Sequence, residues 1–378
     1  MKEVNTTVQS FKESIFATMS ALAAKNEAIN LGQGFPDFDG PLWIRDLARN
    51  SFDGKNQYAP AMGVRPLRSS ISNYYKSFYG LDFDIDSQIT VTNGATEAIF
   101  STCLALINPG DEVIVLEPFY DSYLAAIKLA GGIPVPVTLK APEFSFDLKE
   151  LEKAFGPKTK MIFFNSPHNP TGKVFSKEEM QSISRLVIKH DTYLVSDEVY
   201  EFLTFDGLKH LPIATLEGMR DRVITISSGG KTFGLTGWKI GWITASEKLS
   251  HAIRMVHQFN TFSVCTPLQY AVAEALSKLD SYVPEFVKQY GELRDFFIEG
   301  IVEKGFKPIK SEGTYFVLVP TPNGITDIDY CSELIKTKKV ASIPLSPFYS
   351  KSNEGENYIR FCFAKKKETL AKALMNLS

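Results

Sequence analysis

Polar residues that could do chemistry follow four short apolar runs of this chain. The four segments are Asn93-Gly94-Ala95-Thr96-Glu97, Asn165 to Gly172, Ser196-Asp197-Glu198-Val199-Tyr200 and Ser228-Gly229-Gly230-Lys231. Each apolar run before them has the length and residue types of a buried strand. Ligands of open α/β sheets bind where the strands end. We therefore expect the four segments to line one site.

The first two segments offer groups that bind ligand oxygens. Gly94 and Ala95 let the backbone approach a ligand closely, and free N–H groups at the start of a helix favour a phosphate. Two prolines and a glycine fix the second segment around Asn169, whose amide could donate to a ligand oxygen. Glycine, asparagine and proline are also common in ordinary turns, so neither segment is decisive alone.

The other two segments carry an acid and a lysine. Asp197 follows an apolar run, so its carboxylate needs a positive partner or hydrogen bonds. A protonated ring nitrogen of a cofactor would supply that partner, although an aspartate that caps a helix is a common alternative. Tyr200 lies three residues further on. Lys231 is either a surface charge or a lysine whose amine acts as a nucleophile.

The combination fits pyridoxal 5'-phosphate. That cofactor needs a lysine for its aldehyde, an acid for its ring nitrogen, donors for its ring oxygen and a cradle for its phosphate. A desolvated lysine near other cations has a lowered pKa and is a better nucleophile.

The segments between these motifs alternate between strand and helix patterns over residues 45–280. This alternation predicts an α/β fold with a mainly parallel seven-stranded sheet between helices. Residues 281–378 read as a smaller α+β domain, and we expect residues 1–44 to pack against it. The predicted strands of the sheet are 89–92, 112–116, 135–138, 160–164, 193–196, 223–227 and 239–245, and the clearest helices are 95–106, 122–129, 176–189 and 281–304. Strands 314–319, 341–344 and 358–363 and a helix from Lys366 are expected after them.

Composition excludes several other classes of protein. The chain has 378 residues, of which 44% are hydrophobic and 22% charged, with a net charge of −2, so it shows no sign of binding nucleic acid or an anionic membrane. Its four cysteines form no CxxC pair and read as reduced thiols of a cytoplasmic protein. Its five histidines show neither HxxxH nor HExxH spacing, so no metal site is expected.

Ordered motifs across nearly the whole chain resemble those of the class I and II aminotransferases, the fold-type I enzymes that depend on pyridoxal phosphate. The resemblance runs from Leu31-Gly32-Gln33-Gly34-Phe35-Pro36 to Tyr358-Ile359-Arg360-Phe361. The segments His257-Gln258, Thr261 to Val264, Glu312 to Phe316 and Phe363 to Lys367 look most like the methionine aminotransferases, relatives of the kynurenine–oxoglutarate enzymes.

The resemblance implies a role for each site residue. Lys231 would bond to the cofactor and carry the proton, Asp197 would pair with the ring nitrogen, and Asn169 and Tyr200 would donate to the ring oxygen. Tyr120, rather than its neighbour Phe119, would stack on the ring. The phosphate would be held by Gly94, Ala95, Thr96, Ser228 and Lys239. At the Lys239 position the family has arginine or lysine. Tyr58 would reach the phosphate of the other subunit of a homodimer. Arg360 would grip the substrate carboxylate, helped by Asn169 and the Gly34 amide, although its strand pattern alone favours a solvated arginine.

These roles describe a ping-pong transaminase that exchanges an amino acid and a 2-oxo acid. The segments expected near the substrate side chain carry Phe16, Phe35, Tyr58, Phe262 and Tyr315 and no arginine, which favours methionine, aromatic residues, leucine, glutamine or kynurenine. A cysteine-conjugate β-lyase is the alternative, because it would use the same lysine, aspartate and arginine. A non-catalytic regulator would need an added DNA-binding domain, for which the chain shows no pattern.

Overall fold

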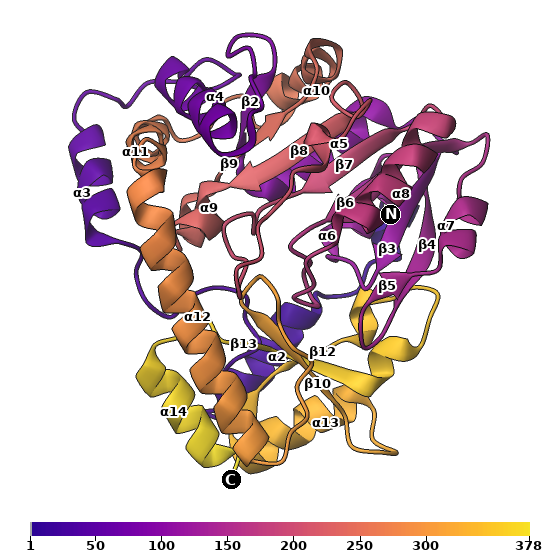
Figure 1. The fold of residues 1–378 in the computed structure, drawn as a ribbon, viewed down its shortest axis with the longest axis vertical. Helices are drawn as coiled ribbons and strands as arrows, with labels where there is room; N and C mark the ends of the chain where they lie inside the picture. The colour runs from indigo at the N-terminus through magenta and orange to yellow at the C-terminus, as the bar shows by residue number, and fades with distance from the viewer. Residues whose placement is uncertain (1) are drawn as a thin grey trace.

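The computed structural model describes residues 2–378, and a large sheet lies at its centre (Figure 1). The strand order is β2-β9-β8-β7-β6-β3-β4-β5. Strand β9 is antiparallel to both of its neighbours and β5 is antiparallel to β4, whereas all other neighbours are parallel. The strands are β2 (Ile89–Asn93), β3 (Glu112–Glu117), β4 (Ile133–Lys140), β5 (Ser145–Phe146), β6 (Thr159–Asn165), β7 (Tyr193–Asp197), β8 (Val223–Ser228) and β9 (Ile240–Thr244).

All seven predicted strands are therefore confirmed, and the sheet is mainly parallel as expected. The prediction of seven strands omitted β5, the eighth. This strand has only two residues, too few to form the apolar run by which a strand is recognised in a sequence.

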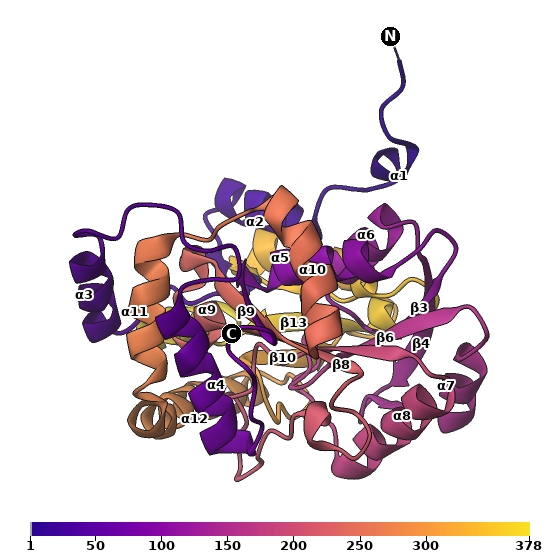
Figure 2. The same cartoon turned by 90° about the horizontal axis from the view of Figure 1, so that it is seen from above.

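Helices cover both faces of the sheet (Figure 2). One face carries α5 (Gly94–Leu106), α6 (Ser122–Leu129) and α10 (Glu247–Asn260), and the other carries α4 (Arg65–Tyr79), α7 (Leu148–Ala154) and α8 (Lys177–Lys189). Successive side chains of β3 enter the two cores in turn: Val113 and Val115 pack under α5 and α6, whereas Ile114 and Leu116 pack on the opposite side. A strand buried on both faces has no polar side, which explains its continuous run of apolar residues.

The predicted helices are confirmed to within two residues at their starts. Helix α8 begins with the expected capping box, in which Ser176 and Glu179 bond each other's backbone amides. The longest helix, α12 (Leu279–Glu303), starts two residues before the predicted position. The other helices before it are α1 (Thr6–Gln9), α2 (Ile15–Lys25), α3 (Leu42–Ser51), α9 (Gly229–Thr232) and α11 (Thr266–Leu276). Across residues 2–378, no helix is both long and apolar enough to cross a membrane.

Helix α2 and strand β1 of the N-terminal segment join the C-terminal elements at the far end of α12, whereas α1 contacts α6 (Figure 1). Strand β1 (Ile29–Asn30) pairs in parallel with β11 (Val340–Ala341). Beside them, β10 (Phe316–Pro320), β13 (Tyr358–Cys362) and β12 (Ile343–Pro344) form an antiparallel sheet flanked by α13 (Asp327–Glu333) and α14 (Lys367–Asn376). The strand predicted at 341–344 is thus divided between two sheets. The limits of the two expected domains stay a prediction.

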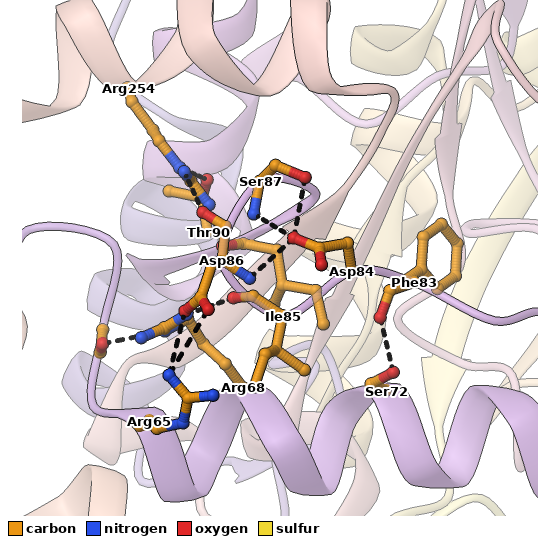
Figure 3. Close-up of polar contacts among 12 residues, drawn as sticks. Arg65, Arg68, Ser72, Phe83, Asp84, Ile85, Asp86, Ser87, Thr90 and Arg254 are labelled. Atoms are coloured by element: carbon orange, nitrogen blue, oxygen red, sulfur yellow. Dashed lines mark hydrogen bonds and ion pairs between the residues drawn. The ribbon is translucent and has the colours of Figure 1, made fainter.

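A polar cluster fixes the start of β2 (Figure 3). Arg254 of α10 donates to the hydroxyl of Thr90 over 2.9 Å and to the carbonyls of Ile89 and Asp86 over 2.6 and 2.7 Å. Arg68 of α4 forms an ion pair of 2.8 Å with the Asp86 carboxylate. Helices from both faces of the sheet therefore hold the strand that leads into the Gly94 turn.

Candidate active site

A cavity of about 170 Å³ lies where β2, β6, β7 and β8 end. Ten of the residues singled out in the sequence line it: Gly94, Ala95, Thr96, Tyr120, Asn169, Asp197, Tyr200, Ser228, Lys231 and Lys239. The remaining lining residues are Asn165, Val199, Gly230 and Thr236. The structure therefore brings the four motifs to one place, as the common orientation of their strands requires.

Lys231 lies on the short helix α9, directly after β8. Its Nζ donates to the Tyr315 hydroxyl over 2.7 Å and to the Gly34 carbonyl over 3.0 Å. Both acceptors are uncharged, and burial lowers the pKa of this amine to about 8, with the nearby Arg360 and Lys239 acting in the same direction. Near neutral pH an appreciable fraction of Lys231 is therefore a free amine, the form that attacks a carbonyl carbon.

Asp197 ends β7 and is buried at the floor of the cavity. Its Oδ2 accepts from the Tyr123 hydroxyl over 2.6 Å, and its Oδ1 accepts from the Val199 amide over 3.4 Å. Burial raises the pKa of Asp197 to about 6 in spite of these bonds. The Asn165 amide also donates to the Asp197 carbonyl over 2.6 Å. A carboxylate so held would favour a cation in the cavity.

The Gly94 turn approaches Lys239 closely. Gly94 has a φ of +73°, and a Cβ added to it would lie 3.1 Å from Lys239 Nζ. A Cβ on Gly241 would lie 2.7 Å from the carbonyl carbon of Gly94, so β9 also needs a glycine beside this turn. The ammonium group thus lies beside the first turn of α5, where helix N–H groups point outwards. This combination suits a phosphate.

Arg360 is 1% exposed, so the solvated position that its strand pattern favoured is wrong. Its side chain stands on one face of β13, where the rings of Phe316 and Phe348 lie around the guanidinium. The guanidinium lies 3.8 Å from the centre of the Phe316 ring and donates to Asn169 Oδ1 over 2.8 Å and to the Gly32 carbonyl over 3.2 Å. The buried Nε of Arg360 has no hydrogen-bond partner within residues 2–378, so this donor is free for a ligand.

Two aromatic residues complete the cavity wall. Tyr120 lines the cavity, whereas its neighbour Phe119 is buried with its amide bonded to the Phe348 carbonyl over 2.9 Å. Of these two neighbours, Tyr120 is therefore the one placed to stack on a ligand ring. Tyr200 is buried and meets the Tyr315 ring edge-on, with ring centres 5.2 Å apart.

Besides Arg360, which donates to the lining residue Asn169, two predicted residues do not line the cavity. Tyr58 is 84% exposed and packs edge-on against Phe262, with ring centres 5.3 Å apart, outside the cavity. Gly34 contacts the site through its carbonyl, which accepts from Lys231 and Tyr315, rather than through its amide. Tyr123 was not among the predicted site residues, although it lies one turn after Tyr120, whose carbonyl accepts the Tyr123 amide over 3.0 Å.

Comparison with known proteins gives the same picture over nearly the whole chain. The family model for aminotransferase class I and II matches residues 26–377. A methionine aminotransferase from Escherichia coli is 40% identical over 96% of this chain and 95% of its own length. A kynurenine–oxoglutarate transaminase from Dictyostelium discoideum is 39% identical over 97% of this chain and 94% of its own.

A solved structure shares the fold. The N-succinyldiaminopimelate aminotransferase from Mycobacterium tuberculosis superposes with a TM-score of 0.96, at 39% sequence identity, over 99% of each chain. The three relatives are named for different amino donors, so the likeness extends to the reaction more firmly than to the substrate.

Proposed function

The chain belongs to the class I and II aminotransferase family, and from that premise we propose that it moves the amino group of a large uncharged amino acid to a 2-oxo acid with pyridoxal phosphate as cofactor. The observation that carries this proposal is the cavity that holds Lys231, Asp197, the Gly94 turn and Lys239 together.

The residues present fit the cofactor on their own chemistry. Within residues 2–378, no cationic group is bonded to the buried Asp197 carboxylate. Lys239 beside the Gly94 turn forms a cradle that a side chain at Gly94 would fill. Ala95, Thr96 and Ser228 would bind the phosphate with Lys239, and Tyr120 would pack on the ring. When bound, pyridoxal phosphate supplies an aldehyde that takes up an amino group and a ring that withdraws electrons from the substrate Cα.

Lys231 would act twice. Its amine would first hold the aldehyde, because its lowered pKa leaves part of it unprotonated near neutral pH. When it is not bonded to the cofactor, Nζ would take the proton from the substrate Cα and deliver it to the carbon of the former aldehyde group. Tyr315 and the Gly34 carbonyl hold the free amine near the cavity. A positioned general base contributes about 10²–10⁴-fold to the rate.

Asp197, Asn169 and Tyr200 would set the charge of the ring. The Asp197 carboxylate would hold the proton on the ring nitrogen, and the Tyr123 hydrogen bond keeps that carboxylate ionised and in place. Asn169 and Tyr200 line the cavity on the Arg360 side, where their amide and hydroxyl would donate to the ring oxygen.

Arg360 would bind the substrate carboxylate with its guanidinium fork. Around it lie the rings of Phe16, Phe316 and Phe348, whose centres are 5.3, 3.8 and 5.6 Å from the guanidinium carbon. The donor class that we propose, methionine, aromatic residues, leucine, glutamine or kynurenine, is the one favoured by the aromatic residues singled out in the sequence. The names of the methionine and kynurenine relatives agree with this substrate class.

We also propose a cytoplasmic homodimer with shared sites. Tyr58 and Phe262 form an exposed aromatic pair outside their own cavity, which suits a contribution to the site of the partner. The four cysteines, Cys103, Cys265, Cys331 and Cys362, are free thiols, as in proteins of reducing compartments.

A donor comparison tests the function. The purified enzyme with pyridoxal phosphate is given one 2-oxo acid and, in separate reactions, methionine, phenylalanine, aspartate, N-succinyldiaminopimelate or a cysteine conjugate. We expect methionine or phenylalanine to give the highest kcat/KM. Aspartate or N-succinyldiaminopimelate as the best donor would overturn the substrate class. Pyruvate and ammonia released from the cysteine conjugate without a 2-oxo acid would favour the β-lyase instead.

A further inference from the structure

His257 lies at a junction that the reaction described above does not use. It is fully buried near the end of α10. Its Nδ1 lies 2.5 Å from Glu97 Oε1, and its Nε2 lies 2.7 Å from the carbonyl oxygen of Ala61. Glu97 belongs to the first turn of α5, directly after the residues proposed to hold the phosphate.

The partners of the ring define its charge. A carbonyl oxygen can only accept a hydrogen bond, and an ionised carboxylate likewise only accepts. Glu97 Oε2 accepts the Asn93 amide over 2.5 Å, and a carboxylate at the start of a helix is favoured by the helix dipole. Both ring nitrogens of His257 must therefore donate, which requires the imidazolium form. The side chain is a buried cation paired with Glu97.

Two segments meet at this cation, and the backbone of the same residue binds a third. The first is the Gly94 turn, held through Glu97 and the Asn93 amide. The second is the loop that carries Tyr58, held through the Ala61 carbonyl. The third is the chain after α10, because the His257 carbonyl accepts the amides of Thr261 and Phe262 over 3.1 and 2.9 Å. The last two segments carry the exposed Tyr58–Phe262 pair.

Helix α10 holds β2 at both ends. Arg254, one turn before His257, bonds the start of the strand through Asp86, Ile89 and Thr90 (Figure 3). His257 bonds Glu97, four residues beyond the end of the strand. The turn between them is therefore fixed relative to α10 by two cationic side chains.

We propose that the His257–Glu97 pair is a positioning pair that shapes the phosphate cradle at residues 94–96 and couples it to the Tyr58–Phe262 surface. The coupling to a partner subunit rests on the proposed function, whereas the positioning of residues 93–97 does not. Neither side chain lines the cavity, so the pair acts through the backbone that it holds.

The pair also makes the cradle sensitive to a rise in pH. Burial by itself lowers the pKa of His257, but the hydrogen bond and charge of Glu97 and the Ala61 carbonyl outweigh burial, so the pKa is raised. Arg254 on the same helix opposes this rise. The pKa of His257 is higher in the folded than in the unfolded protein. Its contribution to the free energy of unfolding is therefore complete below the unfolded pKa of about 6.5, and it is lost as pH rises through the folded pKa.

The test compares two ligands in apoenzyme variants. Pyridoxal phosphate and pyridoxal differ only in the phosphate, so the ratio of their Kd values reports on the cradle. In His257→Gln and Glu97→Gln, we expect pyridoxal phosphate to bind about tenfold or more weakly, the effect of losing a charged hydrogen bond. Pyridoxal should bind within about twofold of the wild-type value, and His251→Gln, an exposed position on the same helix, should leave both Kd values unchanged.

A second measurement needs neither variants nor activity. In ¹⁵N-histidine spectra of the wild-type apoenzyme, His257 should give imidazolium signals at pH 7, because both ring nitrogens face acceptors, and it should lose them at a higher pH than an ordinary histidine. Over that same range the affinity for pyridoxal phosphate should fall relative to pyridoxal. A neutral His257 at pH 7, or folded variants that keep the wild-type ratio of Kd values, would overturn the proposal. If the wild type binds neither ligand, the proposed function fails, while the spectra still decide the charge of His257.

Discussion

The hydroxyl of Tyr123 donates to the buried carboxylate of Asp197 over 2.6 Å, and the Tyr123 ring stacks on Phe163 with ring centres 4.6 Å apart. The bond lowers the pKa of a carboxyl that burial raises. Tyr123 therefore supports the ionised form that the proposed chemistry needs.

Replacing Tyr123 with phenylalanine keeps the stacked ring and removes this bond. We expect kcat/KM to fall about tenfold, because a hydrogen bond to a charged group contributes about 1.5–3 kcal/mol and a tenfold change corresponds to about 1.4 kcal/mol. The pKa of Asp197 should rise, so the acidic limb of the kcat/KM profile should move to higher pH. A variant with the wild-type rate and pH profile would show that the bond is not used in the reaction.

Arg360→Lys should weaken the binding of the substrate carboxylate. The lysine keeps the positive charge but loses the planar fork that now reaches Asn169 and Gly32. We expect KM for methionine to rise about tenfold or more, with a smaller change in kcat. The matched control is the amine that lacks the carboxylate of methionine. If the variant slows both substrates equally, Arg360 does not bind the carboxylate.

Asp197→Asn should stabilise the apoenzyme in a pH-dependent way. The folded pKa of Asp197 is about 6, above its ordinary value of 3.8, so folding favours the protonated acid. The wild type therefore loses stability as pH rises from about 4 to about 6. Above that range the variant should be more stable by on the order of 3 kcal/mol, and below pH 4 the two should be alike.

Chemical unfolding of both apoproteins at pH 4 and pH 7.5 measures this difference. The same gain at both pH values would show that folding does not raise the pKa of Asp197. Asp197→Asn should also bind pyridoxal phosphate less well, because it lacks the carboxylate that would pair with the protonated ring nitrogen.

Hybrid dimers test whether the sites are shared. Lys231→Ala should lose about 10²–10⁴-fold or more in rate, and Tyr58→Ala should bind the cofactor weakly. In a hybrid of these two subunits with shared sites, one site carries both changes and the other carries neither. Activity should then return to a substantial fraction on mixing. If a verified hybrid dimer recovers no activity, Tyr58 does not contribute to the active site of the partner subunit.

The sequence predicted most of the fold because the buried strands have unbroken apolar runs and the helices have recognisable ends, as Ser176 shows. The two-residue strand β5 escaped because it has no pattern of its own. Lys231 and Asp197 could be found because each follows a strand in the same sheet.

Arg360 and Tyr123 show what a pattern cannot give. The burial of Arg360 depends on the rings of Phe16, Phe316 and Phe348, which pack around its guanidinium from other parts of the chain. Tyr123 and Asp197 are 74 residues apart in the sequence, and their hydrogen bond forms only because α6 packs on the sheet that contains β7. The same holds for His257 and Glu97, which are 160 residues apart.

The central claim is that Lys231 carries the cofactor, and borohydride trapping tests it most directly. The enzyme is incubated with pyridoxal phosphate, reduced, digested and mapped by mass spectrometry. The account predicts a single phosphopyridoxyl group on the peptide that contains Lys231, and prior addition of methionine should prevent the labelling. A label on Lys239 instead, or a wild-type protein that stays unlabelled, would contradict it.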